Sequence, residues 1–137
     1  MMNALHLLRK LFIRRKHQRF FVRRGTVVVV VTPGKLGQEE QRRVHVIDIS
    51  MGGAAFIYAG SPNDIDDTGF IKLRSAESLI DEKVHFETIS DILIPDCMDS
   101  VVTLRRRGIR FTWMGVPGEN LLKDFIKDNG LFPKPRE

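Results

Sequence analysis

Cysteine is nearly absent from this chain of 137 residues, which has one, at Cys97. A single cysteine cannot form an internal disulfide, so nothing in the sequence argues for an oxidising compartment. No histidine lies near it in the sequence, and we interpret it as a small, partly buried thiol rather than a nucleophile. With 42 % hydrophobic and 28 % charged residues, the composition is typical of one compact soluble domain with its own core.

A long uninterrupted hydrophobic run is also lacking. Segment 1–13 is rich in apolar residues, but Arg9 and Lys10 interrupt them and no small-residue cleavage site follows. The segment is too short to span a bilayer. We therefore expect no signal peptide, no transmembrane segment and a cytoplasmic protein. The helical spacing of the apolar residues predicts a short helix over 4–13, which should pack on the rest of the chain, on a second copy as a homodimer or, less readily, on a membrane surface.

Acidic residues are missing from the first 38 positions. The same stretch carries nine basic side chains: Arg9, Lys10, Arg14, Arg15, Lys16, Arg19, Arg23, Arg24 and Lys35. The remainder of the chain is mildly acidic, so the basicity is local and implies a local anionic partner. A nucleotide, a nucleic acid, a lipid headgroup and an acidic protein surface all fit this description.

Patterns that would indicate an enzyme or a metal site are lacking too. The four histidines show neither metal-ligand spacing nor a cysteine partner. The sequence has no glycine-rich phosphate loop, no Gly-x-Ser-x-Gly and no framed pair of catalytic carboxylates. We therefore expect a binding protein without catalytic activity and without a metal.

What the chain does contain is a series of short apolar and β-branched segments separated by turn residues. These predict strands over 26–32, 44–49, 54–58, 69–74, 84–94, 101–107 and 109–114, with Gly108 separating the last two. Alternation within 44–49 places Val44, Val46 and Asp48 on one face and Ile47 and Ile49 on the other. An apolar stripe after Pro117 predicts a helix that ends at Asn129-Gly130. The fold class is mainly β, a small antiparallel barrel with a helix over it.

The first candidate binding element is the pair Arg15 and Arg19, within the basic segment 14–25 that we interpret as a loop. An arginine fork can bond the O6/N7 edge of guanine, stack on a base or grip a phosphate. In so basic a stretch this spacing is a weak signal alone, and Arg19 and Arg23 repeat it. A solvated basic run is the simpler alternative.

The second element is Asp48-Ile49-Ser50-Met51-Gly52-Gly53, where one expected strand ends and the next begins. The carboxylate of Asp48 can accept the N1–H and N2–H of guanine, and the Ser50 hydroxyl can bond a phosphate or base oxygen. Gly53 lets the chain turn sharply and lets a ligand approach. The alternative is an Asx or Ser turn that only ends the strand.

In combination, these two elements resemble the PilZ domain family. The stretch Arg106–Phe111 also resembles the final strand of that family, which a C-terminal helix follows, and the resemblance extends over about residues 14–128. It implies a six-stranded antiparallel β-barrel with a C-terminal helix, to which this chain adds the short N-terminal helix. It also implies a bacterial receptor that binds cyclic di-GMP.

The resemblance assigns roles by position. Arg15 and Arg19 would hold the guanines and phosphates of the ligand. Asp48 and Ser50 would read guanine edges and contact phosphate, while Gly53 would permit the turn.

Three more residues are candidates for the same site. Arg14 directly precedes the arginine pair, and an arginine there resembles family members that take a stacked pair of ligands. Arg107 could add a phosphate contact if it shares a face with Arg105, although at least one of the two is expected to be solvated. Trp113 could stack on a base, but a single tryptophan near a strand end is more often part of a core or an interface.

We divide the chain into an N-terminal helical extension (1–13), a barrel domain (14–130) with ligand-binding loop 14–25, and a C-terminal tail (131–137). Ligand binding is expected to order the N-terminal segment and so to signal to a downstream protein partner.

Two alternatives stay open. One is an interaction or scaffold domain of the same fold that binds no ligand. The other is a basic barrel for single-stranded nucleic acid, which predicts aromatic and basic residues interleaved on the barrel face. Because the sequence offers few aromatic residues near the basic ones besides Phe20 and Phe21, nucleic acid is the less favoured partner.

Overall fold

The computed structural model describes residues 17–34, 37–73, 82–95 and 103–133. Its strands are β1 (Phe20–Val22), β2 (Val27–Thr32), β3 (Glu40–Ile49), β4 (Gly53–Ala59), β5 (Thr68–Leu73), β6 (Glu82–Leu93), β7 (Leu104–Trp113) and β8 (Gly130–Pro133). Its helices are η2 (Pro62–Asp64) and α2 (Val116–Asn129). The expected helix over 4–13, and with it the N-terminal extension, lies outside the described residues.

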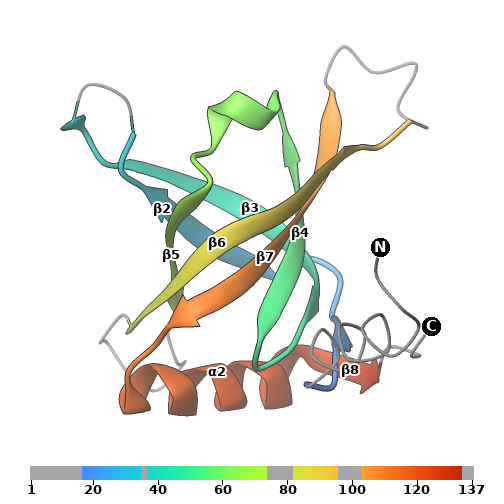
Figure 1. Ribbon diagram of the computed structural model, residues 1–137. Coiled ribbons are helices and arrows are strands. Elements are labelled where there is room, and N and C mark those ends of the chain that lie inside the picture. The colour runs from blue at the N-terminus through green and yellow to red at the C-terminus, as the bar shows by residue number, and fades with distance from the viewer. Residues whose placement is uncertain (1–16, 35–36, 74–81, 96–102, 134–137) are drawn as a thin grey trace, which may run out of the picture.

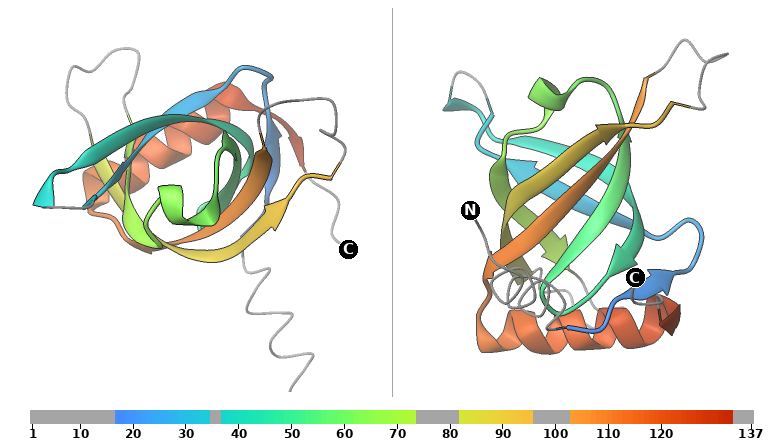
Figure 2. Two further views of the ribbon diagram at one scale, coloured as in Figure 1. Left: turned by 90° about the horizontal axis from the view of Figure 1, so that it is seen from above. Right: turned by 45° about the vertical axis from the view of Figure 1, so that its right-hand side comes forward.

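Six of the strands close into an antiparallel barrel, which confirms the expected fold class. The order is β2-β5-β6-β7-β4-β3, and β3 pairs back to β2. Figure 2 shows the barrel along its axis in the left view. The strands β1 and β8 continue the sheet beyond β3, because β1 pairs with the C-terminal end of β3 that β2 leaves free. Closure removes most of the unpaired edge that an open sheet would expose.

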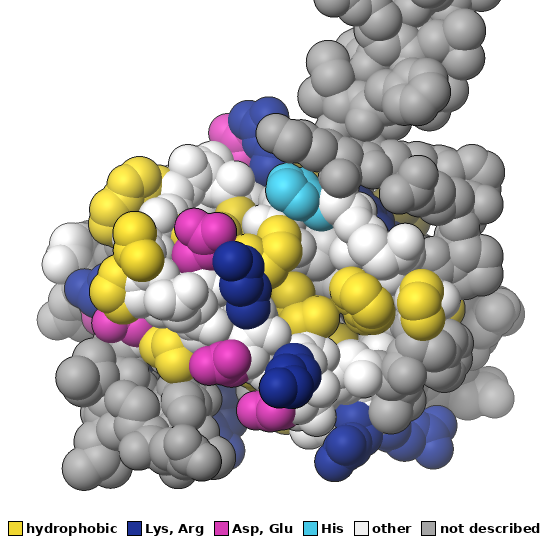
Figure 3. Space-filling model, turned by 90° about the horizontal axis from the view of Figure 1, so that it is seen from below, with side chains coloured by type: hydrophobic (Ala, Val, Ile, Leu, Met, Phe, Trp, Pro, Cys, Tyr) yellow, Lys and Arg dark blue, Asp and Glu magenta, His cyan; other side chains and the backbone are white. Residues whose placement is uncertain are grey.

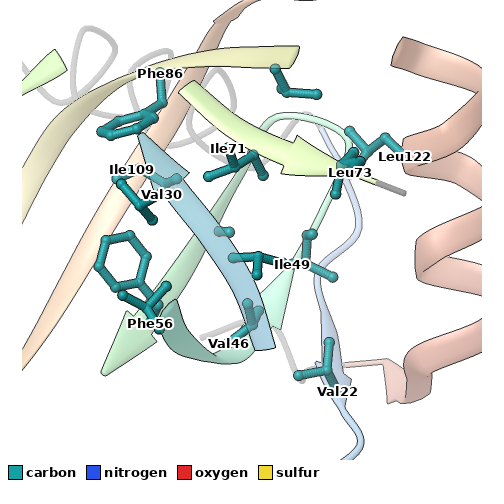
Figure 4. Close-up of a cluster of buried hydrophobic side chains, with 14 of the residues drawn as sticks. Val22, Val30, Val46, Ile49, Phe56, Ile71, Leu73, Phe86, Ile109 and Leu122 are labelled. Carbon is teal, nitrogen blue, oxygen red and sulfur yellow. The ribbon is translucent and has the colours of Figure 1, made fainter. Parts of the chain in front are cut away.

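Alternating side chains of the six strands fill the barrel interior. Figure 4 shows them pointing into a common centre, with Val30, Ile71 and Ile109 among the residues labelled. The valine run of β2 is covered on both faces only in its second half, where Val30 lies in the core and Val31, which faces the other way, is also fully buried. At its start Val27 is 39 % exposed, so the expectation that both faces are covered holds in part. Burying such side chains removes apolar surface from water, which is the main stabilising contribution to the fold.

The helix α2 closes one end of the barrel (Figure 1). Its Leu122 is fully buried and lies beside Leu73 (Figure 4), so the apolar stripe of the sequence faces the core as predicted. The helix begins with Pro117 in its first turn and ends at Asn129, where the Gly130 N–H bonds the Ile126 carbonyl. From this end, lysine or arginine and acidic side chains are interspersed with hydrophobic patches (Figure 3).

Arg107 is 1 % exposed and bonds the η2 segment, which lies at the end of the barrel opposite to α2 (Figure 1). Its Nε donates to Oδ2 of Asp91 at 2.8 Å, and Arg105 bonds the other oxygen of the same carboxylate. The remaining guanidinium N–H groups donate to the Pro62 and Asp66 carbonyls, the Thr88 hydroxyl and the Tyr58 hydroxyl. These bonds tie β7, β6, β4 and the η2 segment together, so a buried charge is matched by a full set of acceptors.

This network also shifts the acidity of its members. Burial raises the pKa of Tyr58, and its hydrogen bond to Asp91 raises it further. Burial alone would raise the pKa of Asp91, but hydrogen bonds from Tyr58, Arg105 and Arg107 outweigh it and lower this pKa below its ordinary 3.8. Asp91 is therefore held as a carboxylate within the barrel wall.

Three local expectations differ from the structure. The segment 14–25 was expected to be a loop, yet it contains β1, which pairs with both β3 and β8. Gly108 does not separate two strands but lies within the continuous β7, paired with Ala55 and Ser90. The expected tail 131–137 begins with most of β8.

Candidate binding site

A β-bulge near the end of β3 turns Asp48 away from the core. Val46 and Asp48 face consecutive residues of β4, so Ile47 is the extra residue. The bulge reverses the alternation, with the result that Ile49 is fully buried in the core and Asp48 belongs to the outer face. The expectation that Asp48 shares a face with Val46 is therefore wrong, and Asp48 lies on the outer side of the barrel wall, away from the core.

Two arginines from distant segments converge on the Asp48 carboxylate. Nη2 of Arg106, on β7, donates to Oδ2 at 3.2 Å, and Nη1 of Arg19 lies 3.9 Å from Oδ1. Arg19 reaches this point because β1 follows it directly and pairs Phe21 with Asp48. The acid is 2 % exposed, whereas Arg106 and Arg19 are 33 % and 44 % exposed. The buried negative charge is thus compensated by cations whose outer sides face solvent.

The turn that follows Asp48 is built around Ser50. Its Oγ accepts the N–H of Gly52 at 3.0 Å and of Gly53 at 3.2 Å, and Ser50 N–H bonds the Gly53 carbonyl at 2.8 Å. The hydroxyl proton has only a long contact, 3.4 Å, to the Gly53 carbonyl. Ser50 therefore shapes the turn through its acceptor lone pairs, and its proton can be redirected to a ligand oxygen.

Gly53 is required by a close approach between strands. A Cβ at this position would lie 2.2 Å from the carbonyl oxygen of Ile109 on β7, far inside van der Waals contact. A Cβ at the neighbouring Gly52 would instead meet the imidazole of His17 at 2.8 Å, and this side chain is exposed and able to move. The turn can therefore pack against β7 only with glycine at 53.

Beside Asp48, small residues lie on the outer face of the barrel. Asp48, Ala55 and Gly108 are neighbours in register across β3, β4 and β7, and all three are buried. Ile89 lies next to Gly108, Ile92 is in register with Arg106, and these two isoleucines are 52 % and 56 % exposed. Exposed apolar side chains next to an arginine can contact the flat face of a planar, anionic ligand.

The structure brings together Arg19, Asp48, Ser50 and Gly53 and places two other candidates elsewhere. Arg107 is enclosed within the barrel wall, on the face opposite to Arg106. Arg105 lies on the same face of β7 as Arg107, as the strand spacing predicted. The expectation that at least one of these two arginines is solvated is wrong, since both bind Asp91. Trp113 lies on the outer face of β7, 62 % exposed and in contact with His85, so it is not a core residue. Arg14 and Arg15 lie outside the described residues.

Arg106 is the member of this site that sequence reasoning did not single out. It is the middle one of three consecutive arginines, and strand periodicity separates it from its two neighbours. Periodicity alone does not say which of the two faces is the outer one. That answer comes from the Asp91 carboxylate, which draws Arg105 and Arg107 to the other side.

The groups of the site are suited to binding a ligand. They include one carboxylate acceptor, arginine forks and a hydroxyl, which are complementary to a guanine edge and a phosphate. Among the described residues, no group of histidine, cysteine, aspartate or glutamate side chains is arranged to hold a metal ion. In the same part of the chain, no helix has the length and apolar character needed to cross a membrane.

Comparison with known proteins gives one family and several solved structures. A family model described as PilZ domain matches residues 13–92 of this chain. No curated protein matches it.

The solved structures share the fold at low sequence identity. The PilZ domain with c-di-GMP of YcgR from Escherichia coli is 17 % identical, with a TM-score of 0.59 over 84 % of this chain and 90 % of that one. The K. pneumonia MrkH–c-di-GMP complex is 17 % identical, with a TM-score of 0.59 over 84 % of this chain and 52 % of that one. The Bacillus subtilis inhibitor of motility MotI/DgrA is 17 % identical, with a TM-score of 0.56 over 84 % of this chain and 51 % of that one. The chain thus spans nearly the whole YcgR domain but about half of the other two proteins.

Proposed function

This chain belongs to the PilZ domain family, and we propose that it is a receptor that binds cyclic di-GMP on the outer face of its barrel. The observation that carries the proposal is the Asp48 carboxylate, buried beneath Arg19 and Arg106 and followed by the Ser50 turn. The YcgR domain and MrkH have the same fold, and both were solved with c-di-GMP. These two structures support the choice of ligand.

Each group of the site has a role that its chemistry suits. Asp48 accepts the N1–H and N2–H of one guanine, a role that suits the two oxygens of a carboxylate. Arg19, with Arg15 before it, holds phosphate and a guanine O6/N7 edge. Charge-assisted bonds of this kind contribute about 1.5–3 kcal/mol each.

The turn and the exposed isoleucines complete the site. Ser50 donates a hydrogen bond to a phosphate oxygen, and Gly53 keeps the turn close to β7 so that Ser50 stays beside Asp48. Ile89 and Ile92 contact the flat side of a guanine. An arginine at position 14 extends the cationic loop, and we propose that it favours two stacked ligands over one.

The receptor acts in the cytoplasm as a binding module without catalysis, and binding orders the segment before β1. Ligand phosphates neutralise the basic residues of segment 14–19, which is then held against the barrel. The change reaches the N-terminal extension and presents a surface to a downstream protein. Hydrogen exchange of residues 1–16 tests this step: protection should rise with saturating cyclic di-GMP, and identical exchange with and without ligand contradicts it.

Isothermal titration calorimetry with cyclic di-GMP tests the binding itself. The wild type should bind saturably, and Arg15→Ala and Asp48→Asn should each lose most of the affinity. Arg43→Ala and Asp124→Asn are matched controls, because both remove an exposed charge away from this site. The number of cyclic di-GMP molecules bound per chain tests the role of Arg14. Arg14→Leu should lower this number from two to one.

The same titration separates the alternatives. A folded wild type that gives no heat would contradict the receptor function and favour an interaction domain that binds no ligand. Equal losses in Arg15→Ala and Arg43→Ala, with no loss in Asp48→Asn, would point to nonspecific charge attraction instead.

A further inference from the structure

The outer face of β5, β6 and β7 carries three cross-strand rows of side chains beyond the Asp48 site. The first row is Thr68, Glu87 and Arg110, where Arg110 forms an ion pair with Glu87. The second is Phe70, His85 and Trp113, and the third is the pair Lys72 and Lys83. In all three rows the side chains face away from the core, because their neighbours Ile71, Val84 and Phe86 fill it.

The second row is a continuous line of aromatic rings. The ring centroids of Phe70 and His85 are 5.6 Å apart, and those of His85 and Trp113 are 5.5 Å apart. Cross-strand aromatic pairs stabilise a sheet, which would explain Phe70 and His85. It does not explain Trp113, which is 62 % exposed at the end of the row, since an exposed tryptophan loses the contribution of its large apolar surface.

The third row places two positive charges directly opposite each other. Lys72 and Lys83 are partners in the β5–β6 register, and Lys83 Nζ lies 4.8 Å from the centroid of the Phe70 ring. Like charges in this arrangement destabilise a sheet. Neither lysine has a carboxylate partner within the described part of the chain. An anion that bridges the two ammonium groups would convert this repulsion into binding.

A cavity of about 380 Å³ opens beside the aromatic row. It is lined in part by Phe70, His85 and Phe86, and by the carboxylates of Glu39 and Glu87. A planar group that stacks on Phe70 could extend into this cavity, where the carboxylates accept the hydrogens of an exocyclic amine.

We propose that this face, formed by Phe70, Lys72, Lys83, His85 and Trp113, is a second binding surface that takes single-stranded nucleic acid. Unpaired bases stack on the rings, and the lysines contact the phosphates that join them. Phosphate and planar ring occur together in a nucleic acid strand, which is why it fits both rows better than an acidic peptide does. The sequence made nucleic acid the less favoured partner because few aromatic residues besides Phe20 and Phe21 lie near the basic ones; the pairing of β5, β6 and β7 places Phe70, Lys72, Lys83, His85 and Trp113 on one face.

The chain provides its own probe, because Trp113 is its single tryptophan. We would titrate the full chain with a mixed-sequence DNA single strand of about 16 nucleotides, the upper site size for one small barrel. Trp113 fluorescence should be quenched saturably, and a duplex of the same sequence should bind more weakly. Lys72→Ala and Lys83→Ala should each lower the slope of log affinity against log salt by about 0.7.

Three variants separate this surface from the rest of the molecule. Phe70→Ala should weaken binding by at least about fivefold, the loss of one stacked base. Lys123→Ala, which removes an exposed lysine of α2 that pairs with Glu119, should leave the salt slope unchanged. Arg19→Ala should keep the quenching although it should lose cyclic di-GMP, so the two proposals can fail independently.

Several results would overturn the proposal. One is a folded wild type whose Trp113 fluorescence is unaffected by saturating oligonucleotide. Another is quenching that Arg19→Ala abolishes and the two lysine variants leave intact, which would place the strand on the basic loop. Quenching that follows protein concentration without oligonucleotide would identify the face as an interface between two copies of the chain.

Discussion

Arg106 and Asp48 are 58 residues apart in the sequence, yet Nη2 of the first lies 3.2 Å from Oδ2 of the second. Their strands are not neighbours, since β4 runs between β7 and β3. The arginine can cross β4 because the residue of β4 in register with Asp48 is Ala55, whose methyl group leaves the path open. The pair thus joins β7 to β3 across β4, at the point where the proposed ligand would bind.

Replacing Arg106 tests whether this arginine helps to bind the ligand or competes with it for the Asp48 carboxylate. Its guanidinium group is 33 % exposed and can donate to a phosphate while it still faces Asp48. We expect Arg106→Ala to weaken cyclic di-GMP binding about tenfold, the loss of one charge-assisted hydrogen bond. Arg106→Lys should be intermediate. Calorimetry measures this change, and tighter binding in Arg106→Ala would show that the arginine blocks Asp48 in the free protein.

The two adjacent glycines of the turn should respond differently to the same substitution. Gly53→Ala puts a methyl group 2.2 Å from the backbone carbonyl of Ile109, so β4 and β7 must separate. We expect a loss of about 2–4 kcal/mol in the free energy of unfolding. Gly52→Ala meets only the side chain of His17 and should cost less than about 1 kcal/mol. Urea unfolding of both variants gives the comparison, and equal losses would contradict the assigned packing.

The sequence predicts the barrel well because its strands are short, β-branched and punctuated by turn residues. It fails at Asp48 because the bulge at Ile47 reverses the faces of the strand, and a bulge has no reliable local signature. It fails at Gly108 because a glycine within a strand looks like a break, whereas here the missing side chain leaves room for the Ser90 hydroxyl on β6.

The position of Arg107 could not be inferred from sequence for a related reason. The groups that bond it lie 16 to 49 residues away, on two other strands and the η2 segment. An arginine in a basic strand is expected to face solvent, and only the converging acceptors make its burial favourable. Arg19 could be predicted because it belongs to a local motif with a fixed distance to Asp48.

Replacing Arg107 should therefore affect stability rather than the proposed ligand contacts. Arg107→Met keeps much of the side-chain volume but leaves the Asp91 carboxylate and the Pro62 and Asp66 carbonyls without their donor. We expect a loss of about 3–5 kcal/mol in the free energy of unfolding, as when one partner of a buried ion pair is removed. Arg110→Met is the control, since that arginine is 63 % exposed, and it should cost less than about 1 kcal/mol. Denaturant unfolding that shows similar small losses in both variants would contradict a structural role for Arg107.

The Asp91 carboxylate should also make stability depend on acid pH. Its pKa is lowered below 3.8 in the folded protein, so the unfolded chain takes up this proton more readily than the folded one. The resulting stabilisation is fully present above the ordinary pKa and is lost as pH falls through the lower, folded-state pKa. Asp91→Asn should be less stable than wild type near neutral pH, and the gap should narrow as the pH falls from about 5 to 2. Unfolding free energies measured across that range check this, with Asp124→Asn, an exposed acid on α2, as the control. A gap between Asp91→Asn and wild type that stays constant with pH would mean that protonation of Asp91 is not coupled to folding.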